Sequence, residues 1–126
     1  MTSAPEADGL AFDLRGEGGA VVFLHGLATT RLIWRRVLPL LAGGRRLMAV
    51  DVPGFGASPA VGPDFDLQAV ASSFDDGLAR AGIEDGYDLM GHSMGGALAI
   101  ALAARRPGRV RRLVLYAPAK LKPTSS

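Results

Sequence analysis

The sequence predicts an α/β fold, a three-layer α/β/α domain with a mostly parallel sheet. Short apolar runs alternate with helix-length segments along the 126 residues, and this alternation is typical of strands joined by helical crossovers. Residues 20–24 are continuously apolar, as expected for a strand buried on both faces. The chain is 48% hydrophobic, which is enough for one modest core, so residues 1–126 are expected to form a single domain.

The expected elements follow from the hydrophobic pattern and from the positions of glycine and proline. Strands are expected at residues 10–15, 20–24, 46–52, 87–90 and 113–116, and helices at residues 31–42, 66–82 and 94–106. The first helix would carry its apolar side chains on one side, namely Ile33, Val37, Leu40 and Leu41. Pro39 predicts a break or a short final turn in it. Residues 1–8 and 120–126 are expected to be disordered.

Composition excludes several classes of protein. The chain has no cysteine, which excludes disulfides and thiolate metal sites. It has no run of 18 apolar residues, so no membrane-spanning helix and no membrane partner are expected. The N-terminus has neither the basic start nor the apolar stretch of a secretory signal. We therefore expect a cytoplasmic protein.

The net charge of +2 hides an asymmetry along the chain. Residues 1–93 hold seven Arg and twelve acidic residues, whereas residues 94–126 hold five Arg, two Lys and no acidic residue. A basic tail of this kind is a candidate for nucleic-acid binding. These arginines are interleaved with core residues, however, and no nucleic-acid-binding motif accompanies them. We expect them to cap a helix and line the sheet, with no nucleic acid as partner.

The strongest functional signal is the segment Gly91-His92-Ser93-Met94-Gly95-Gly96. It lies between an expected strand and an Ala-rich expected helix. A serine at such a sharp turn takes a strained backbone conformation and projects its side chain, and Gly91 and Gly95 are required where a Cβ would clash. The helix that begins at Met94 directs its N-terminal amides toward developing negative charge. The pattern indicates a nucleophile elbow.

Three further segments extend this motif to a family. Val21-Val22-Phe23-Leu24-His25-Gly26 resembles the strand and His-Gly turn before the oxyanion loop of α/β-hydrolases, and residues 51–58 (DVPGFGAS) resemble that family's D-x-P-G-x-G-x-S loop. Pro107-Gly108-Arg109-Val110 resembles the family's connection into the next strand. The matches occur in the family's order and cover residues from about 10 to 119. The chain thus resembles the N-terminal portion of an α/β-hydrolase of the serine esterase or lipase type.

The resemblance implies a role for several residues. Ser93 would be the nucleophile, and the backbone amides of Met94 and Leu27 would form the oxyanion hole. Gly26, Gly91 and Gly95 would be structural parts of the motif. Asp51 and Ser58 would be loop-fixing residues rather than catalysts, and Gly54 and Gly56 would permit turn conformations. The family mechanism implies neither a metal nor an organic cofactor, and serine in place of aspartate at the elbow argues against dehalogenases and epoxide hydrolases.

The only two histidines are His25 and His92, and neither matches the family's catalytic histidine. By resemblance, His25 shapes the oxyanion turn and His92 is the variable position of the elbow. A general base must reach its target within about 3 Å or through one water. The His92 side chain is expected to diverge from that of its neighbour Ser93, and His25 projects from another strand end.

The sequence departs from the family after the elbow. The triad order in this fold is Ser, then an acid, then His, but no Asp, Glu or His follows Ser93. We therefore expect a truncated α/β-hydrolase core that lacks the last strands and the cap and is nearly inactive alone. In a completed enzyme, Ser93 would attack a small-molecule ester or a related acyl or C–C substrate. The alternative is a non-catalytic α/β-hydrolase-like module for binding or dimerisation.

The C-terminal region carries two further expectations. Both lysines fall in the last seven residues of a chain that otherwise uses arginine, which suggests a truncation or a frameshift. The last expected strand, Leu113–Tyr116, is apolar and would be an open edge of the sheet. Open apolar edges pair with other chains, so self-association through this strand is expected.

Overall fold

The computed structural model describes residues 2–7, 10–27, 29–41, 43–56, 58, 60, 66–83 and 86–119. Within these ranges six strands form one sheet in the order β1-β2-β4-β3-β5-β6. Their bounds are β1 Thr2–Ala7, β2 Leu10–Gly16, β3 Gly19–Leu24, β4 Arg45–Val50, β5 Tyr87–His92 and β6 Val110–Tyr116. β2 pairs antiparallel with β1 and β4, whereas β4, β3, β5 and β6 run parallel to one another.

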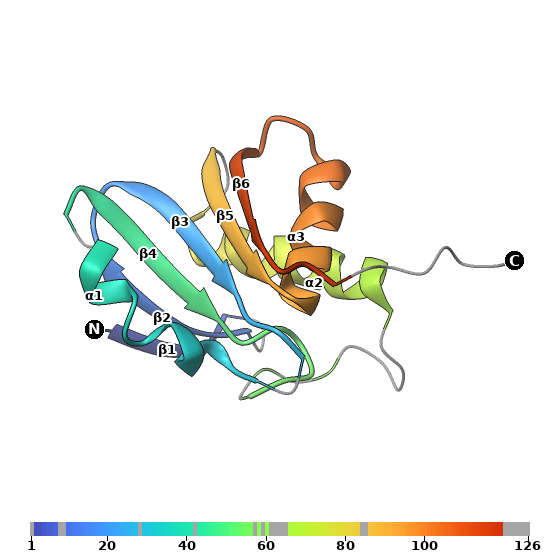
Figure 1. Cartoon of the computed structure of the whole chain (residues 1–126), viewed down its shortest axis with the longest axis horizontal. Coiled ribbons are helices and arrows are strands. Elements are labelled where there is room, and N and C mark those ends of the chain that lie inside the picture. The colour runs from blue at the N-terminus through green and yellow to red at the C-terminus, as the bar shows by residue number, and fades with distance from the viewer. Residues whose placement is uncertain are drawn as a thin grey trace, which may run out of the picture.

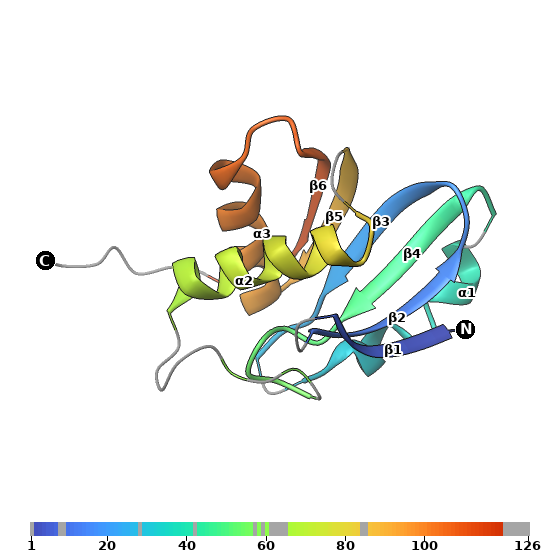
Figure 2. The same ribbon diagram turned by 180° about the vertical axis from the view of Figure 1, so that it is seen from behind.

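Helices cover both faces of this sheet (Figures 1 and 2). The helices α2 (Leu67–Arg80) and α3 (Met94–Arg105) lie on one face, and the short elements η1 (Arg31–Trp34) and α1 (Leu38–Leu41) lie on the other. The predicted three-layer α/β arrangement with a mostly parallel sheet is thus confirmed. No helix in the described ranges combines the length and the apolar character needed to cross a membrane.

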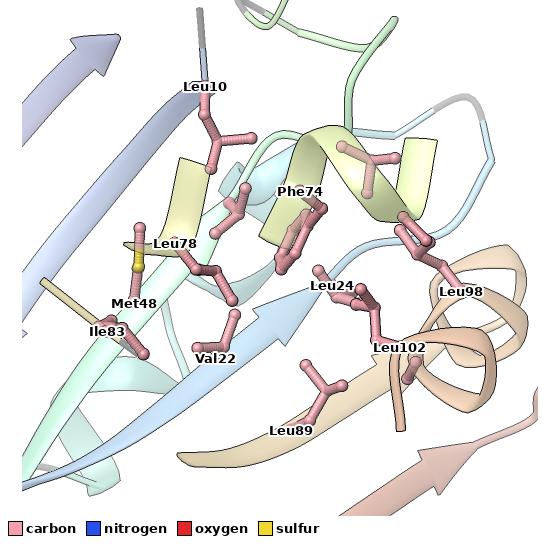
Figure 3. Packing of buried hydrophobic residues seen from close by; sticks show 14 of the residues in the cluster. Leu10, Val22, Leu24, Met48, Phe74, Leu78, Ile83, Leu89, Leu98 and Leu102 are labelled. Carbon is pink, nitrogen blue, oxygen red and sulfur yellow. The ribbon is translucent and has the colours of Figure 1, made fainter. Parts of the chain in front are cut away.

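The larger core lies between the sheet and the pair α2 and α3 (Figure 3). Helix α2 begins at the cap Asp66, whose carboxylate accepts hydrogen bonds from the amides of Gln68 and Ala69. Its apolar side chains recur at helical spacing and are buried in this core, as the sequence pattern predicts; they are Val70, Phe74 and Leu78. Phe74 and Leu78 can be followed in Figure 3. A smaller core on the opposite face joins Trp34 and Leu38 to strands β3 and β4.

The prediction of a helix at residues 31–42 is wrong in two respects. The segment is not one continuous helix, and the side chains that it buries are not the expected ones. The structure has a 3₁₀ turn, η1, then a turn at residues 35–37, then the four-residue α1 with Pro39 in its first turn, where proline is tolerated. Because a 3₁₀ helix has three residues per turn, its side chains point in other directions than those of a continuous α-helix would. Trp34 and Leu38 face the sheet, whereas Ile33 and Leu40 are exposed.

The N-terminal end of the chain also differs from expectation. Residues 2–7, expected to be disordered, form β1 and pair with β2; Met1, Asp8 and residues 120–126 lie outside the described residues. Strand β6, although apolar, is largely exposed, because β5 is its only partner among the described strands.

Acidic residues from earlier in the chain pair with Arg105, Arg111 and Arg112. Arg105 pairs with the buried Asp75 of α2 at 3.2 Å. Arg111 and Arg112 lie 3.8 and 3.9 Å from the carboxylate of Asp88 on β5. These arginines therefore tie α3 and β6 to neighbouring elements, in the structural role that the interleaved pattern indicates.

Replacement of Phe74 tests the core between α2 and the sheet. Phe74 is fully buried, so we expect Phe74→Ala to lower the free energy of unfolding by about 3–5 kcal/mol. Urea denaturation followed by circular dichroism measures this change. Leu40→Ala is the control, because Leu40 is 83% exposed and its truncation should cost less than about 0.5 kcal/mol. Equal losses in the two variants would contradict the packing described above.

Candidate active site

Ser93 sits at the turn between β5 and α3 in a backbone conformation that side-chain-bearing residues rarely adopt. Its φ is 55° and its ψ is −119°, in a region that is strained for a residue with a Cβ. Hydrogen bonds on both sides hold this conformation. The Ser93 amide donates to the Tyr116 carbonyl at 3.1 Å, and the Ser93 carbonyl accepts from Gly96 at 2.9 Å and from Ala119 at 2.8 Å. The turn has the geometry of a nucleophile elbow.

The glycines around Ser93 allow three backbone segments to meet. A Cβ on Gly91 would overlap the Gly95 carbonyl and lie 2.7 Å from the Gly96 Cα. A Cβ on Gly95 would overlap the carbonyls of Leu24 and His25 at the end of β3. Real Cβ atoms do not approach backbone atoms this closely, so both positions require glycine. The α3 N-terminus therefore packs directly against the end of β3.

The turn after β3 lies beside the elbow. A Cβ on Gly26 would lie 3.1 Å from the Ser93 Cβ and 3.3 Å from the His92 Nδ1, so Ser93 and His92 both border the same point on this turn. The His92 ring also stacks on Tyr116 with its centroid 5.0 Å away. Leu27, the next residue of the turn, has an exposed side chain. The structure thus brings the Leu27 segment and Ser93 together.

Met94 is the first residue of α3. Amides in the first turn of a helix have no acceptor within the helix, and the nearby Ser93 carbonyl is already taken by Gly96 and Ala97. The helix end therefore presents N–H groups, with partial positive charge, next to Ser93.

His25 is buried, and both of its ring nitrogens are engaged. Nε2 accepts a hydrogen bond from the Val52 amide at 2.9 Å, which leaves Nδ1 to donate to the Gly26 carbonyl at 2.8 Å. Burial lowers the pKa of His25 below its ordinary value of 6.5, and the Gly26 hydrogen bond and the charge of Asp51 offset only part of this effect. His25 is therefore a neutral bridge between the turns after β3 and β4, in the position that the resemblance implies for a shaping residue.

Asp51 holds the segment that follows the turn after β3. Its carboxylate is fully buried and accepts hydrogen bonds from the Arg31 amide at 2.7 Å and from the Arg31 guanidinium. Arg31 also pairs with Asp13 of β2 at 3.1 Å. Burial opposes the charge on Arg31, but Asp51 and Asp13 outweigh it and raise the pKa of Arg31. A Cβ on Gly56 would collide with the Asp51 carboxylate.

Ser58 anchors the loop after β4 to the sheet. Its buried hydroxyl accepts a hydrogen bond from the Ala11 amide of β2 at 2.8 Å, and its carbonyl accepts from Gly54 at 3.1 Å. Both Gly54 and Gly56 have positive φ, as loop-fixing positions in tight turns require. Asp51 and Ser58 therefore support the loops in this geometry, as the sequence analysis expects.

Three residues that contribute to the site are not predicted from the sequence. Arg31 is the partner of Asp51, Thr29 donates from its hydroxyl to the Gly26 carbonyl at 2.7 Å, and Tyr116 accepts from Ser93 and stacks on His92. The Arg31–Asp51 pair spans 20 positions, so no local pattern reports it. Thr29 lies three residues after Gly26, which is the spacing of a hydroxyl-capped turn. Of the three residues, only Thr29 could therefore have been predicted from the sequence.

Gly91→Ala tests the close packing at the elbow. The new methyl group would be forced into the backbone of α3, so we expect a loss of about 3 kcal/mol in the free energy of unfolding. Gly19→Ala is the matched control, because its Cβ would meet only the end of the Arg111 side chain at 3.3 Å. Both are measured by urea denaturation. If the control loses as much stability as Gly91→Ala, backbone crowding at the elbow is not the cause.

The buried, neutral His25 predicts a pH dependence of stability. Because its pKa is lowered in the folded chain, the unfolded chain binds more protons as the pH falls below about 6.5, and stability falls with it. The slope contributed by one such group is at most about 1.4 kcal/mol per pH unit. We expect urea unfolding between about pH 5.5 and 7.5 to show this slope in the wild type and in His92→Gln, but reduced in His25→Gln. An unchanged slope in His25→Gln would assign the effect to other groups.

Comparison with known proteins agrees with this geometry. The family model described as the alpha/beta hydrolase fold matches residues 19–126. The chain is 41% identical over 97 residues to a pimeloyl-[acyl-carrier protein] methyl ester esterase of Neisseria meningitidis, covering 77% of this chain and 35% of that protein. It is 40% identical over 104 residues to a 2-hydroxy-6-oxo-2,4-heptadienoate hydrolase of Pseudomonas putida, covering 79% of this chain and 37% of that protein.

A solved structure shows the same arrangement. The crystal structure of wild-type Cfl2 from Burkholderia cenocepacia superposes with a TM-score of 0.78 at 37% identity, covering 86% of this chain and 37% of that one. The chain thus spans little more than a third of the length of each of these relatives. The family match, the sequence relatives and the shared fold together show that this chain belongs to the α/β-hydrolase fold family.

Proposed function

We propose that this chain carries the nucleophile half of a serine hydrolase, with Ser93 attacking a carboxylic ester or a related acyl or C–C substrate. The observation that carries this proposal is the positive φ of Ser93 at the strand-to-helix turn. A protein retains a strained serine only where the surrounding structure imposes it, and such residues cluster at active sites. The relatives support the class of reaction, since one is named a methyl ester esterase and another a hydrolase of an oxo-dienoate.

The proposed chemistry is acyl transfer to the serine hydroxyl. The Ser93 Oγ adds to the carbonyl carbon, its proton passes to a base, and the carbonyl oxygen takes the negative charge. The amides of Met94 and Leu27 would donate to that oxygen, and loss of one such donor costs about 3 kcal/mol of transition-state stabilisation. Collapse expels the leaving group, which takes the proton from the base as the acyl-enzyme forms. Water then adds to the acyl-enzyme and gives a proton to the base. Release of the acid returns that proton to the Ser93 Oγ.

The proton acceptor is the limiting part of the site. No Asp, Glu or His follows Ser93 in the sequence, whereas the triad of this fold follows the order Ser, acid, His. Of the two histidines, His25 has both ring nitrogens engaged in hydrogen bonds. The other, His92, precedes Ser93 in the chain, and its ring stacks on Tyr116. We therefore propose that full turnover needs an acid and a histidine that this chain does not carry, and that the chain alone is slower by about a million-fold.

The same feature supports a second candidate, a non-catalytic module that keeps the fold for binding. It differs from the first in the reactivity expected of Ser93, which would then equal that of any exposed serine.

The absence of cysteine fits a cytoplasmic location for either candidate.

Labelling with a fluorophosphonate separates these candidates. We expect slow but selective modification of Ser93, at least about tenfold faster than of the exposed helical Ser72 in the same chain, because only Ser93 lies beside helix-end amides. Mass spectrometry of the digested protein measures both rates, and Ser93→Ala is the control. Equal rates at the two serines would favour the binding module. A rate at Ser93 typical of serine esterases would refute the proposed dependence on missing groups.

A further inference from the structure

The Gly26 carbonyl, in the turn after β3, accepts three hydrogen bonds. The Thr29 amide donates to it at 3.3 Å, and the Thr29 hydroxyl donates to it at 2.7 Å. The third donor is the Nδ1 of His25 at 2.8 Å. A carbonyl oxygen has two lone pairs, so three donors saturate it. The orientation of this carbonyl is therefore fixed more firmly than the single bond of an ordinary turn would fix it.

A fixed Gly26 carbonyl also fixes the direction of the Leu27 N–H. The two groups belong to one peptide unit, which is trans, and the C=O and N–H of a planar trans unit point in opposite directions. The carbonyl is held toward His25 and Thr29. The Leu27 N–H is consequently held away from both of them.

The Leu27 N–H is also available to an outside acceptor. Among the described residues, no carbonyl or side chain accepts a hydrogen bond from it. The peptide that carries it begins at the buried Gly26, where a Cβ would lie 3.1 Å from the Ser93 Cβ. An N–H that is fixed in direction, unpaired within the described structure and next to the elbow has the properties that an oxyanion donor needs.

We propose that Thr29 is a positioning residue of the oxyanion hole, which acts by holding the Gly26–Leu27 peptide. Thr29 itself does not touch the substrate. This role rests on the proposed function, because it matters only if the Leu27 amide donates to a negative oxygen formed at Ser93. Hydrogen bonds in a chain polarise one another, so the donors on the Gly26 carbonyl also increase the partial positive charge on the Leu27 hydrogen.

The Thr29 hydroxyl can be removed with little effect on the rest of the fold. Its contacts lie within the turn, on the Gly26 carbonyl and, at 3.4 Å, on the His25 Nδ1. Loss of one such hydrogen bond costs about 1 kcal/mol. The neighbouring Thr30 is a matched comparison, because its hydroxyl accepts from the Leu32 amide at 3.3 Å and caps η1 instead.

Fluorophosphonate labelling of Ser93 tests this role. The Ser93 Oγ displaces fluoride from phosphorus, the hydroxyl proton leaves with the fluoride, and the phosphoryl oxygen takes the oxyanion position. We expect Thr29→Val to lower the rate constant at saturating probe about tenfold, which is part of the roughly 10²–10³-fold lost with a whole donor. The half-saturating probe concentration should change less than about twofold. Thr29→Ser should restore the rate, and the control Thr30→Val should leave it unchanged.

The phosphorus NMR resonance of the labelled protein provides a second readout. This resonance responds to hydrogen bonds on the phosphoryl oxygen, which a purely structural role of Thr29 would not change in the folded protein. We expect the resonance of Thr29→Val to move from the wild-type position toward that of the urea-unfolded adduct. Thr29→Ser and Thr30→Val should keep the wild-type position.

The outcomes separate this role from the proposed function. Equal labelling of Ser93 and Ser72 in the wild type would refute both. Selective labelling of Ser93 that Thr29→Val leaves unchanged, or that Thr30→Val lowers as much, would overturn the role of Thr29 alone. A Thr29→Ser variant as slow as Thr29→Val would do the same. If circular dichroism shows that Thr29→Val is unfolded, Thr29→Ala removes the hydroxyl without a new methyl group and carries the same expectations.

Discussion

The close approach of backbone segments at the elbow is the constraint on which the site depends. Ser93 keeps its positive φ because β5, the start of α3 and the end of β3 meet around it. They meet only because Gly91 and Gly95 have no side chain between them. The strain of one serine, about 1–3 kcal/mol, is held by packing that involves three elements. Loss of that contact would let Ser93 relax to an ordinary turn and move its hydroxyl away from the helix-end amides.

A second set of contacts fixes the turn that faces the elbow. His25 and Asp51 are both fully buried, and burial of such groups is tolerated only when their polar atoms are paired. Here His25 connects the turn after β3 to Val52, while Asp51 connects the loop after β4 to Arg31. Each residue connects one strand end to the next, so a movement of one loop relative to the other would break these buried hydrogen bonds. The position of the Leu27 segment relative to Ser93 is thus set from β4 as well as from β3.

The sequence predicts the parts of this molecule that depend on local pattern. The elbow, the parallel strands and α2 are predicted from contiguous apolar runs, from helical spacing and from glycine positions, and the structure agrees with them. The prediction of which side of residues 31–42 is buried was wrong, because a 3₁₀ turn rotates the side chains relative to those of a continuous α-helix. The Arg31–Asp51 pair and strand β1 were missed for another reason: both arise from tertiary pairing, which leaves no short-range signal.

The exposed edge and the elbow are mechanically linked through the end of β6. The Tyr116 carbonyl accepts from the Ser93 amide, and the Tyr116 ring stacks on His92. Strand β6 has one partner strand, so its end is held by β5, by α3 and by little else among the described elements. Terminal strands with few contacts open most easily, and each opening would remove an acceptor from the strained serine. Anything that pairs the free edge of β6 therefore also stabilises the elbow, without touching Ser93. In this fold the order of Ser93 depends on how the last described strand is covered.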